Sequence, residues 1–333
     1  MGVIQYVAKR VGLYIAVLFI GLTITFLLPR LMPANPIDGY IGQIQSRASG
    51  ALTGDAIVQL RASLEELYGL KGDIFTQYLA YLNRVVLRFD FGPSFTYYPQ
   101  PVSQMIFNAL PWTLGLLLIS TFVAWVLGNM VGLVAGYFHT KKAATILEVV
   151  GILLYPIPYY ILAVSVILLL AYIIPIFPLS PTFPVGQMTP AKVGMVIYNS
   201  LLPAITLVLA GFGWNILSMK ALAVATAEEP YVTYARLKGT SNWTRMLRYV
   251  FRNAMLPQVT ALALSLGTIF NGALLTEMLF SYPGVGLIMR TAASGGDYNV
   301  LYGAIAISII AVATAGLVID LIYPLLDPRI RHK

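Results

Sequence analysis

The chain of 333 residues contains no cysteine and only two histidines, His139 and His332. The absence of cysteine excludes disulfides, thiolate zinc sites, iron–sulfur clusters and cysteine nucleophiles. Two histidines are too few for a histidine-rich metal site. We therefore expect no metal site and no thiol chemistry in this chain.

Nucleotide-binding and hydrolytic motifs are missing as well. The sequence has no G-x-x-x-x-G-K-[ST] run to hold ATP phosphates, no G-x-S-x-G elbow and no H-E-x-x-H pair. We therefore expect a protein that is not an enzyme, has no catalytic residues and binds no cofactor itself. If ATP drives its activity, the ATP and Mg²⁺ must be bound by partner subunits.

Charged side chains are scarce. Asp, Glu, Lys and Arg make up 10% of the residues, whereas soluble globular domains carry about 25%. Apolar residues make up 58%. A soluble domain must cover itself with polar side chains, and this chain has too few. The composition excludes a cytosolic enzyme, a disordered protein and a nucleic-acid-binding protein, and it indicates an integral membrane protein.

The apolar residues gather in windows without charge. After the two longest windows are trimmed, each one has about the length that an α-helix needs to cross a bilayer, roughly 20 residues. The sequence therefore predicts an all-α protein with six transmembrane helices, at about 11–29, 110–138, 145–173, 193–219, 253–276 and 298–319. Pro156 and Pro158 lie inside the third window and should bend it.

The basic residues predict the orientation. With both termini in the cytoplasm, the inner segments hold thirteen of the twenty-one Lys and Arg residues, which satisfies the positive-inside rule. We expect a multi-pass protein of the cell membrane with three parts. They are residues 1–31 with the first helix, an extracytoplasmic segment 32–107, and a five-helix core 108–333 with a cytoplasmic loop at 220–256.

Within the extracytoplasmic segment, residues 55–68 carry apolar side chains at helical spacing, namely Ile57, Leu60, Leu64 and Leu67. This pattern predicts a short amphipathic helix. Farther along, Glu148 lies close to Lys141 and Lys142 in the sequence, and we expect an ion pair there at the membrane surface.

The loop 220–256 contains the run Glu228-Glu-Pro-Tyr-Val-Thr-Tyr-Ala-Arg-Leu-Lys-Gly239, followed by Arg248-Tyr-Val-Phe-Arg-Asn-Ala-Met-Leu-Pro257. Further motifs are Tyr6-Val-Ala-Lys-Arg10 with Pro33-Ala-Asn-Pro36, Asp90-Phe-Gly-Pro-Ser94 with Leu110-Pro-Trp-Thr-Leu114, Phe280-Ser-Tyr-Pro-Gly-Val-Gly286, and Leu326-Asp-Pro-Arg-Ile-Arg331. Together these runs resemble the inner-membrane permeases of dipeptide and oligopeptide ABC importers. The resemblance covers essentially the whole chain.

The resemblance implies a type I ABC importer permease architecture. It also implies that the loop forms a coupling helix that docks on an ATPase subunit, through Tyr231, Thr233, Tyr234, Ala235, Arg236, Lys238 and Gly239. Gly239 should end this helix, because glycine accepts the left-handed conformation of a C-cap. The broader importer motif begins Glu-Ala-Ala, whereas this chain has Thr233-Tyr234-Ala235. The alternative is that the basic residues only satisfy the positive-inside rule.

Polar and amphipathic side chains within or at the end of the predicted helices are candidates for the translocation path: Asn129, Trp214, Asn215, Ser265, Asn271 and Glu277. Such groups also hold membrane helices together by hydrogen bonds, so both interpretations stay open. Glu277 lies near the outer end of the fifth window, where it would line a gate or contact a docked protein.

The resemblance implies four kinds of partner: a second, related permease subunit, two ATP-binding subunits, an extracytoplasmic solute-binding protein and the lipid bilayer. The expected cargo is di- or oligopeptides, with oligosaccharides as the alternative, and nickel uptake also occurs in this branch. A self-sufficient secondary transporter or a channel is the competing class. It predicts inverted repeats or rings of filter residues, and neither is visible in the sequence.

Overall fold

The computed structural model describes residues 3–31, 36–47, 54–67, 72–184, 186, 189–267 and 273–326. Over these ranges the chain is helical, and its one β contact is an isolated bridge between Pro93 and Pro101. This confirms the predicted all-α class. The chain divides into two compact units. The first contains Leu114–Tyr282 with Met1–Val3 and Ala315–Lys333, and the second contains Ile4–Thr113 and Pro283–Thr314.

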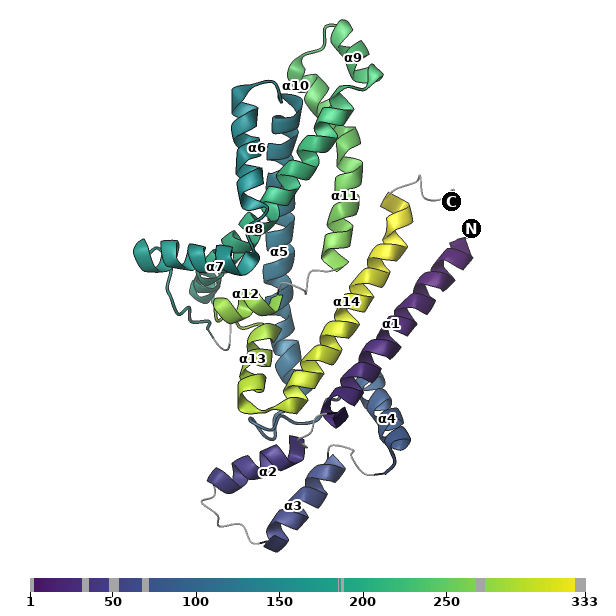
Figure 1. Cartoon of the computed structure of the whole chain (residues 1–333), viewed down its shortest axis with the longest axis vertical. Coiled ribbons are helices and arrows are strands. Elements are labelled where there is room, and N and C mark those ends of the chain that lie inside the picture. Colours follow the sequence, from purple (N-terminus) through teal and green to yellow (C-terminus); the bar gives the residue numbers. More distant parts are fainter. Residues whose placement is uncertain are drawn as a thin grey trace. The chain divides into compact units, whose positions relative to one another are not determined.

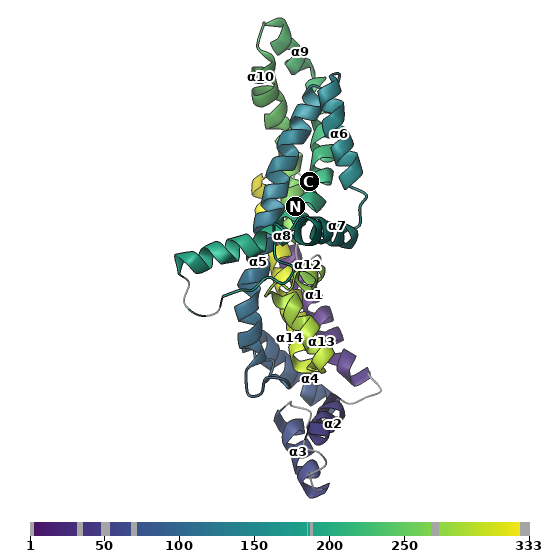
Figure 2. The ribbon, with the colours of Figure 1, turned by 90° about the vertical axis from the view of Figure 1, so that its left-hand side faces the viewer.

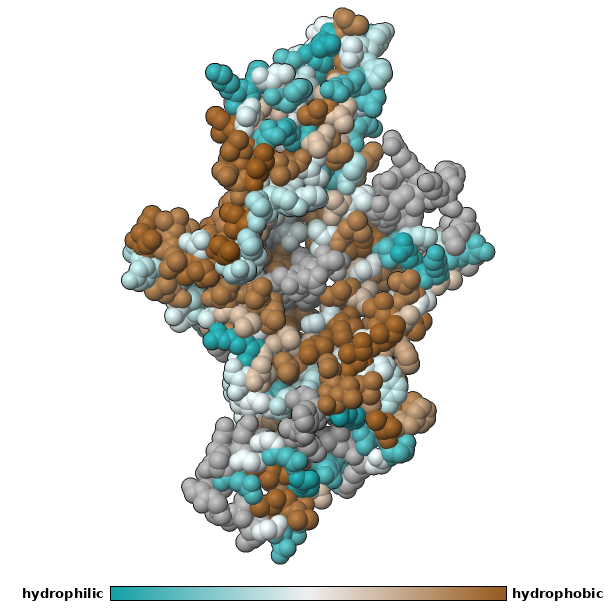
Figure 3. Space-filling view, in the orientation of Figure 1, coloured by the Kyte–Doolittle hydropathy of each residue, from teal (hydrophilic) through white to brown (hydrophobic). Residues whose placement is uncertain are grey.

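Within the described ranges four helices are long and apolar enough to cross a membrane: α1 (Val3–Leu31), α5 (Val102–Tyr137), α8 (Pro190–Ala227) and α14 (Tyr298–Leu326). They cover four of the six predicted windows. Their apolar side chains are widely exposed, as along α1, where Leu13, Ile15, Phe19 and Ile20 are each more than half exposed. Brown, hydrophobic atoms accordingly cover the region of α1 and α14 in Figure 3. Such surfaces fit a lipid environment.

The third predicted window is broken, as its prolines predict. It consists of α6 (Lys142–Leu154) and α7 (Tyr159–Ile167), the latter continued by the π-helix η2 (Leu168–Ile173). The two parts meet at an angle of 102°. Pro156 and Pro158 lie in the break, where each removes a backbone donor. If this bent pair is one span, the described helices supply five spans.

The fifth window lies partly outside the described residues. Its first part is α11 (Arg252–Gly267), and α12 (Ala273–Leu279) follows after residues 268–272, which the structure does not describe. The remaining helices are α2 (Pro36–Arg47), α3 (Gly54–Leu67), α4 (Ile74–Leu82), η1 (Asn83–Leu87), α9 (Pro230–Leu237), α10 (Asn242–Thr244), η3 (Arg245–Phe251) and α13 (Val285–Gly295). Six spans therefore stay a prediction.

A seam of glycines joins α5 to α8 in the first unit. Gly128, Gly132 and Gly136 recur every four residues, so they lie on one side of α5. A Cβ added at Gly132 would lie 2.5 Å from the carbonyl oxygen of Ile216, and one at Gly136 would lie 2.6 Å from that of Lys220. The two backbones therefore approach as closely as small-xxx-small helix pairs do in membranes.

Polar contacts add to this packing. The buried Gln258 of α11 donates from Nε2 to Oγ of Ser218 on α8 over 2.8 Å. The backbone carbonyl of Gln258 accepts from Nε1 of Trp125 on α5 over 3.0 Å. Glu148 of α6 forms an ion pair with Lys220 of α8. The expected pairing of Glu148 with Lys141 and Lys142 is therefore wrong, because helix packing brings a lysine from a distant part of the sequence to it.

In the second unit α1 lies beside α14 (Figure 1), with Tyr14 hydrogen-bonded to Thr314 over 3.2 Å. The far end of α1 is held by α4, where Arg30 donates to Oε1 of Gln77 over 2.8 Å. The predicted amphipathic helix is α3, whose Leu64 is buried against Ile41 of α2, with Ile57 and Leu60 packed around them. The side chain of Leu67 lies outside the described part.

Candidate functional site

The candidate site is α9 with the residues that end and support it. Pro230 occupies the first turn of α9, where its missing N–H costs no hydrogen bond. At the other end Gly239 has φ +78°, its N–H bonds to the carbonyl of Arg236 over 3.0 Å, and that of Thr240 bonds to the carbonyl of Ala235 over 3.3 Å. This pair of bonds is the Schellman motif. The structure thus contains the left-handed glycine that the sequence predicts.

The helix has a buried side and an exposed side. Val232 and Ala235 are buried, and Val232 packs with Met246 and Val250 of η3. Ala235 therefore faces the chain itself in this conformation.

The exposed side of α9 carries two tyrosines and a leucine. Tyr231 is 40% exposed, Tyr234 is 60% exposed and Leu237 is 79% exposed. These three residues recur every three positions, so they form one stripe. Arg236 and Lys238 are exposed beside it, with Nζ of Lys238 4.9 Å from the ring centre of Tyr234, and Thr233 is half-buried. Partial burial, together with the negative charge of Glu229, raises the pKa of Tyr231.

Figures 1 and 2 both place α9 and α10 at the end of the first unit where α5 stops and α6 begins. Contacts support this placement. The ring of Trp243 lies 6.1 Å from that of Phe138, edge to face. Nε of Arg245 donates to Oη of Tyr137, the last residue of α5, over 3.2 Å.

Arg245 lies beyond α9 in the sequence and is not among the residues that the resemblance implies for the coupling helix. It nevertheless also donates to the carbonyl of Thr240 and to Oδ1 of Asn242, and so holds the turn that ends α9. Tyr137 and Arg245 are 108 residues apart, and no local pattern links them. Only the folded chain reveals their contact.

The residues predicted for the translocation path lie in varied surroundings. Asn129, Asn215 and Ser265 each donate to a carbonyl of their own helix, over 2.7, 2.8 and 2.8 Å. Trp214 is half exposed, with its ring 5.5 Å from that of Tyr155. Their part in translocation stays a prediction.

The other two path candidates differ. Glu277 on α12 is fully buried, so in this conformation it offers no surface to a docked protein. Asn271 lies outside the described residues. The second unit contains a pocket, and none of the described path candidates lines it.

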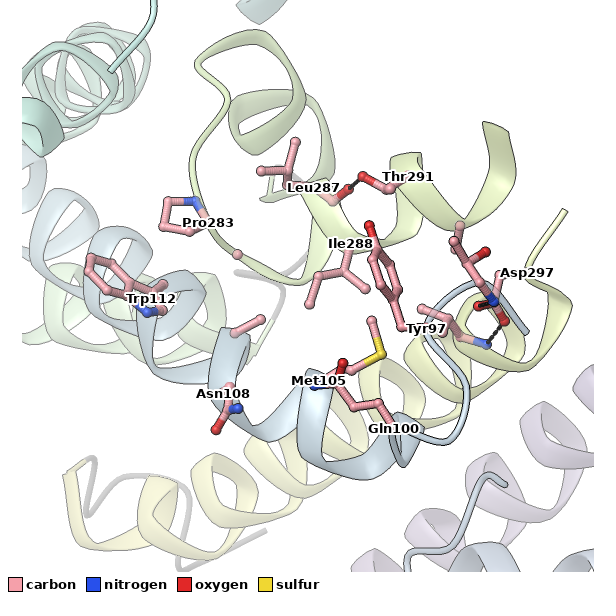
Figure 4. Close-up of a pocket in the computed structure, with 15 residues that line it drawn as sticks. Tyr97, Gln100, Met105, Asn108, Trp112, Pro283, Leu287, Ile288, Thr291 and Asp297 are labelled. Atoms are coloured by element: carbon pink, nitrogen blue, oxygen red, sulfur yellow. Dashed lines mark hydrogen bonds between the residues drawn. The ribbon is translucent and has the colours of Figure 1, made fainter. Parts of the chain in front are cut away.

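That pocket has a volume of about 400 Å³ and lies between the start of α5, α13 and the start of α14 (Figure 4). Its walls combine apolar, aromatic and neutral polar side chains with the carboxylate of Asp297. The labelled lining residues are Tyr97, Gln100, Met105, Asn108, Trp112, Pro283, Leu287, Ile288, Thr291 and Asp297. Sequence reasoning did not anticipate it, because it forms only when segments far apart in the chain meet.

A buried carboxylate shapes this pocket. Asp297 is 1% exposed and accepts hydrogen bonds from Oγ of Ser94, from the N–H of Thr96 over 3.0 Å and from the N–H of Val300 over 3.2 Å. The last of these bonds is an N-cap of α14, and an Asp before a helical apolar run is a signal for such a cap. Throughout the described ranges, no three His, Asp or Glu side chains are placed to hold a metal ion.

Comparison with known proteins identifies the family. Residues 128–332 match the family described as "Binding-protein-dependent transport system inner membrane component". The dipeptide transport system permease protein DppB of Bacillus subtilis is 27% identical over 99% of this chain and 99% of its own length. A peptide permease of Brucella ovis is 28% identical, over 98% and 99%. The nickel import system permease protein NikB of Staphylococcus aureus is 24% identical, over 99% and 93%.

Proposed function

The chain belongs to the family of binding-protein-dependent transport system inner membrane components, and from this membership we propose that it is a permease subunit of an ATP-driven importer of di- or oligopeptides. It is a multi-pass protein of the plasma membrane. The proposal includes six spans, both termini in the cytoplasm and the loop 220–256 on the cytoplasmic side. The basic residues of that loop support this orientation.

The observation that carries the proposal is the apolar stripe of Tyr231, Tyr234 and Leu237 on the exposed side of α9. Exposed aromatic and apolar side chains on a short helix, here one that ends in a Schellman motif, are typical of a surface that docks in a partner's groove. Arg236 and Lys238 flank the stripe and suit acidic residues around such a groove. We infer that α9 docks on an ATPase subunit.

In this assembly the chain forms half of the pore and a second, related permease forms the other half. Two partner subunits bind ATP and Mg²⁺, and an extracytoplasmic binding protein delivers the cargo. The residues of α9 bind the ATPase, and the helices that support α9 carry its movement into the membrane. The chain itself moves no proton and breaks no bond.

The peptide cargo rests on the relatives named for peptide transport, such as the dipeptide permease of Bacillus subtilis. The nickel import permease of Staphylococcus aureus matches 99% of this chain, so proteins of this family framework carry names for more than one cargo class. Oligosaccharides are the second candidate that the sequence raised. Tyr97 and Trp112, with the amides of Gln100 and Asn108, give the pocket aromatic faces and neutral polar groups that suit sugars as well as peptides.

Purification with the encoded partners tests the proposal. We expect this chain to co-purify with a second permease and two ATPase subunits. After reconstitution, hydrolysis of ATP should rise when the binding protein is loaded with a dipeptide, and not when it is offered a neutral trisaccharide or Ni²⁺. A functional transporter made of this chain alone would contradict the assembly. Stimulation by the sugar or the metal alone would contradict the cargo.

A further inference from the structure

Arg245 lies where an isolated helix would not favour a cation. Oγ of Ser241 accepts the N–H of Thr244 over 3.2 Å and so caps the helix that begins at Asn242. Arg245 is therefore close to the N-terminal end of a continuous helix formed by α10, η3 and α11. The macrodipole makes this end positive, so a basic side chain is unfavourable there unless other groups bind it.

The guanidinium of Arg245 binds groups from separate segments. Its Nε donates to Oη of Tyr137 over 3.2 Å, and its two terminal nitrogens donate to the carbonyl of Thr240 and to Oδ1 of Asn242. Tyr137 ends α5, and Thr240 follows directly on the glycine that ends α9. One planar and permanently charged group thus connects the end of α9 with the end of α5.

The connection continues into α9. Thr240 donates both its N–H and its hydroxyl to the carbonyl of Ala235, over 3.3 and 2.8 Å. Oη of Tyr137 in turn donates to Oδ1 of Asn242 over 3.5 Å, so two of the groups that accept from Arg245 also contact each other. A displacement at the C-terminal end of α9 therefore reaches α5 through Thr240, Arg245 and Tyr137.

We propose that Arg245 and Tyr137 form a positioning clamp that transmits the movement of α9 to the transmembrane helix α5. The inference rests on the proposed function, because it takes α9 as the element that docks on the ATPase. The hydrogen bonds of Arg245 are to other residues of this chain, and neither Arg245 nor Tyr137 belongs to the exposed stripe of α9. The clamp should therefore determine how much cargo moves for each ATP hydrolysed, and not whether the ATPase binds.

The test compares variants of the whole complex in proteoliposomes with dipeptide-loaded binding protein. Three quantities are measured: co-purification of the ATPase subunits, thermal stability, and dipeptide transported per ATP hydrolysed. In Arg245→Gln and Tyr137→Phe the co-purification of the ATPase subunits and the thermal stability should match wild type. Transport per ATP should fall about tenfold, as expected for the loss of a charge-assisted hydrogen bond. Arg245→Lys keeps the charge without the planar fork and should recover part of the ratio.

Two controls sharpen the result. In the double variant Arg245→Gln/Tyr137→Phe the transport per ATP should fall no further than in Arg245→Gln alone, because both changes remove the same contact. Lys142→Gln removes one exposed positive charge from the same end of the unit and should keep the wild-type ratio.

The outcomes separate the two proposals. A wild-type ratio in both clamp variants, with the ATPase subunits bound, overturns the clamp and leaves the proposed function intact. Loss of the ATPase subunits or of thermal stability in the clamp variants also overturns it, because the contact is then a structural brace. Failure of the wild-type chain to co-purify with ATPase subunits overturns the proposed function itself.

Discussion

Gly239 has φ +78°, and a Cβ added to it would meet no atom within 4 Å. A side chain at this position therefore causes no collision with neighbouring groups, and its cost is confined to the backbone. For an L-residue the left-handed conformation costs about 1–2 kcal/mol, and more for a β-branched one. The residue therefore offers a way to disturb the end of α9 without disturbing the packing of the membrane helices.

We predict that Gly239→Val abolishes coupling while leaving the fold in place. The strained turn should open the Schellman motif and release the C-terminal end of α9 from its docking geometry. Transport should fall by orders of magnitude, and ATP hydrolysis should no longer respond to loaded binding protein. Membrane insertion and thermal stability should stay close to wild type, as measured by fractionation and by unfolding in detergent.

Gly186 provides the matched control. It has φ +83° and equally open space for a Cβ, but it lies in the connection before α8. Gly186→Val carries the same kind of backbone strain at a site outside α9 and its supporting contacts, so it should transport normally. If Gly186→Val and Gly239→Val lose transport to the same extent, backbone strain alone explains the loss and α9 is not the coupling element.

At the scale of whole helices, the seam between α5 and α8 sets the geometry that α9 acts on. Gly132 lies where a Cβ would come within 2.5 Å of the carbonyl oxygen of Ile216 and 2.9 Å of Cβ of Met219. Real Cβ atoms do not approach a backbone oxygen so closely, so the two helices would have to separate. Gly115 lies on the same helix, but a Cβ there would meet nothing within 4 Å.

Alanine should destabilise the protein at Gly132 but not at Gly115. Gly132→Ala should lower the free energy of unfolding by about 1–3 kcal/mol, the usual cost of overpacking. Gly115→Ala should leave stability unchanged or raise it by up to about 1 kcal/mol, because alanine favours a helix over glycine. Thermal unfolding of the two variants in the same detergent measures the difference. Equal melting temperatures would show that the seam tolerates a methyl group and that close approach is not required.

Across the full chain, the sequence predicts the helices that a bilayer requires, and it does not predict the side-chain contacts between distant segments. The helices at α1, α5, α8 and α14 follow from apolar runs, because lipid leaves a backbone few alternatives to a helix. The break in the third window follows from Pro156 and Pro158, which cannot donate a hydrogen bond.

Contacts between distant segments could not be predicted in this way. Glu148 pairs with Lys220 and not with the lysines near it in sequence, because the packing of α6 on α8 selects the partner. The Tyr137–Arg245 contact and the pocket beside Asp297 arise from the same cause. The left-handed conformation of Gly239 could be predicted, because it depends on the backbone of that residue at the end of the helix that the resemblance implies.

The docking of α9 on a cytoplasmic partner depends on the orientation of the chain in the membrane. The chain has no cysteine, so a single introduced cysteine is its only target for a thiol reagent. Val58 on α3 is 67% exposed, and Lys142 at the start of α6 is also exposed. In intact cells a membrane-impermeant maleimide should label Val58→Cys and not Lys142→Cys, and opening the cells should make Lys142→Cys reactive. The positive-inside rule requires this outcome, because Lys142 belongs to the basic segments and Val58 to the long outer one. Labelling of Lys142→Cys in intact cells would place α9 outside the cell, beyond the reach of any cytoplasmic ATPase.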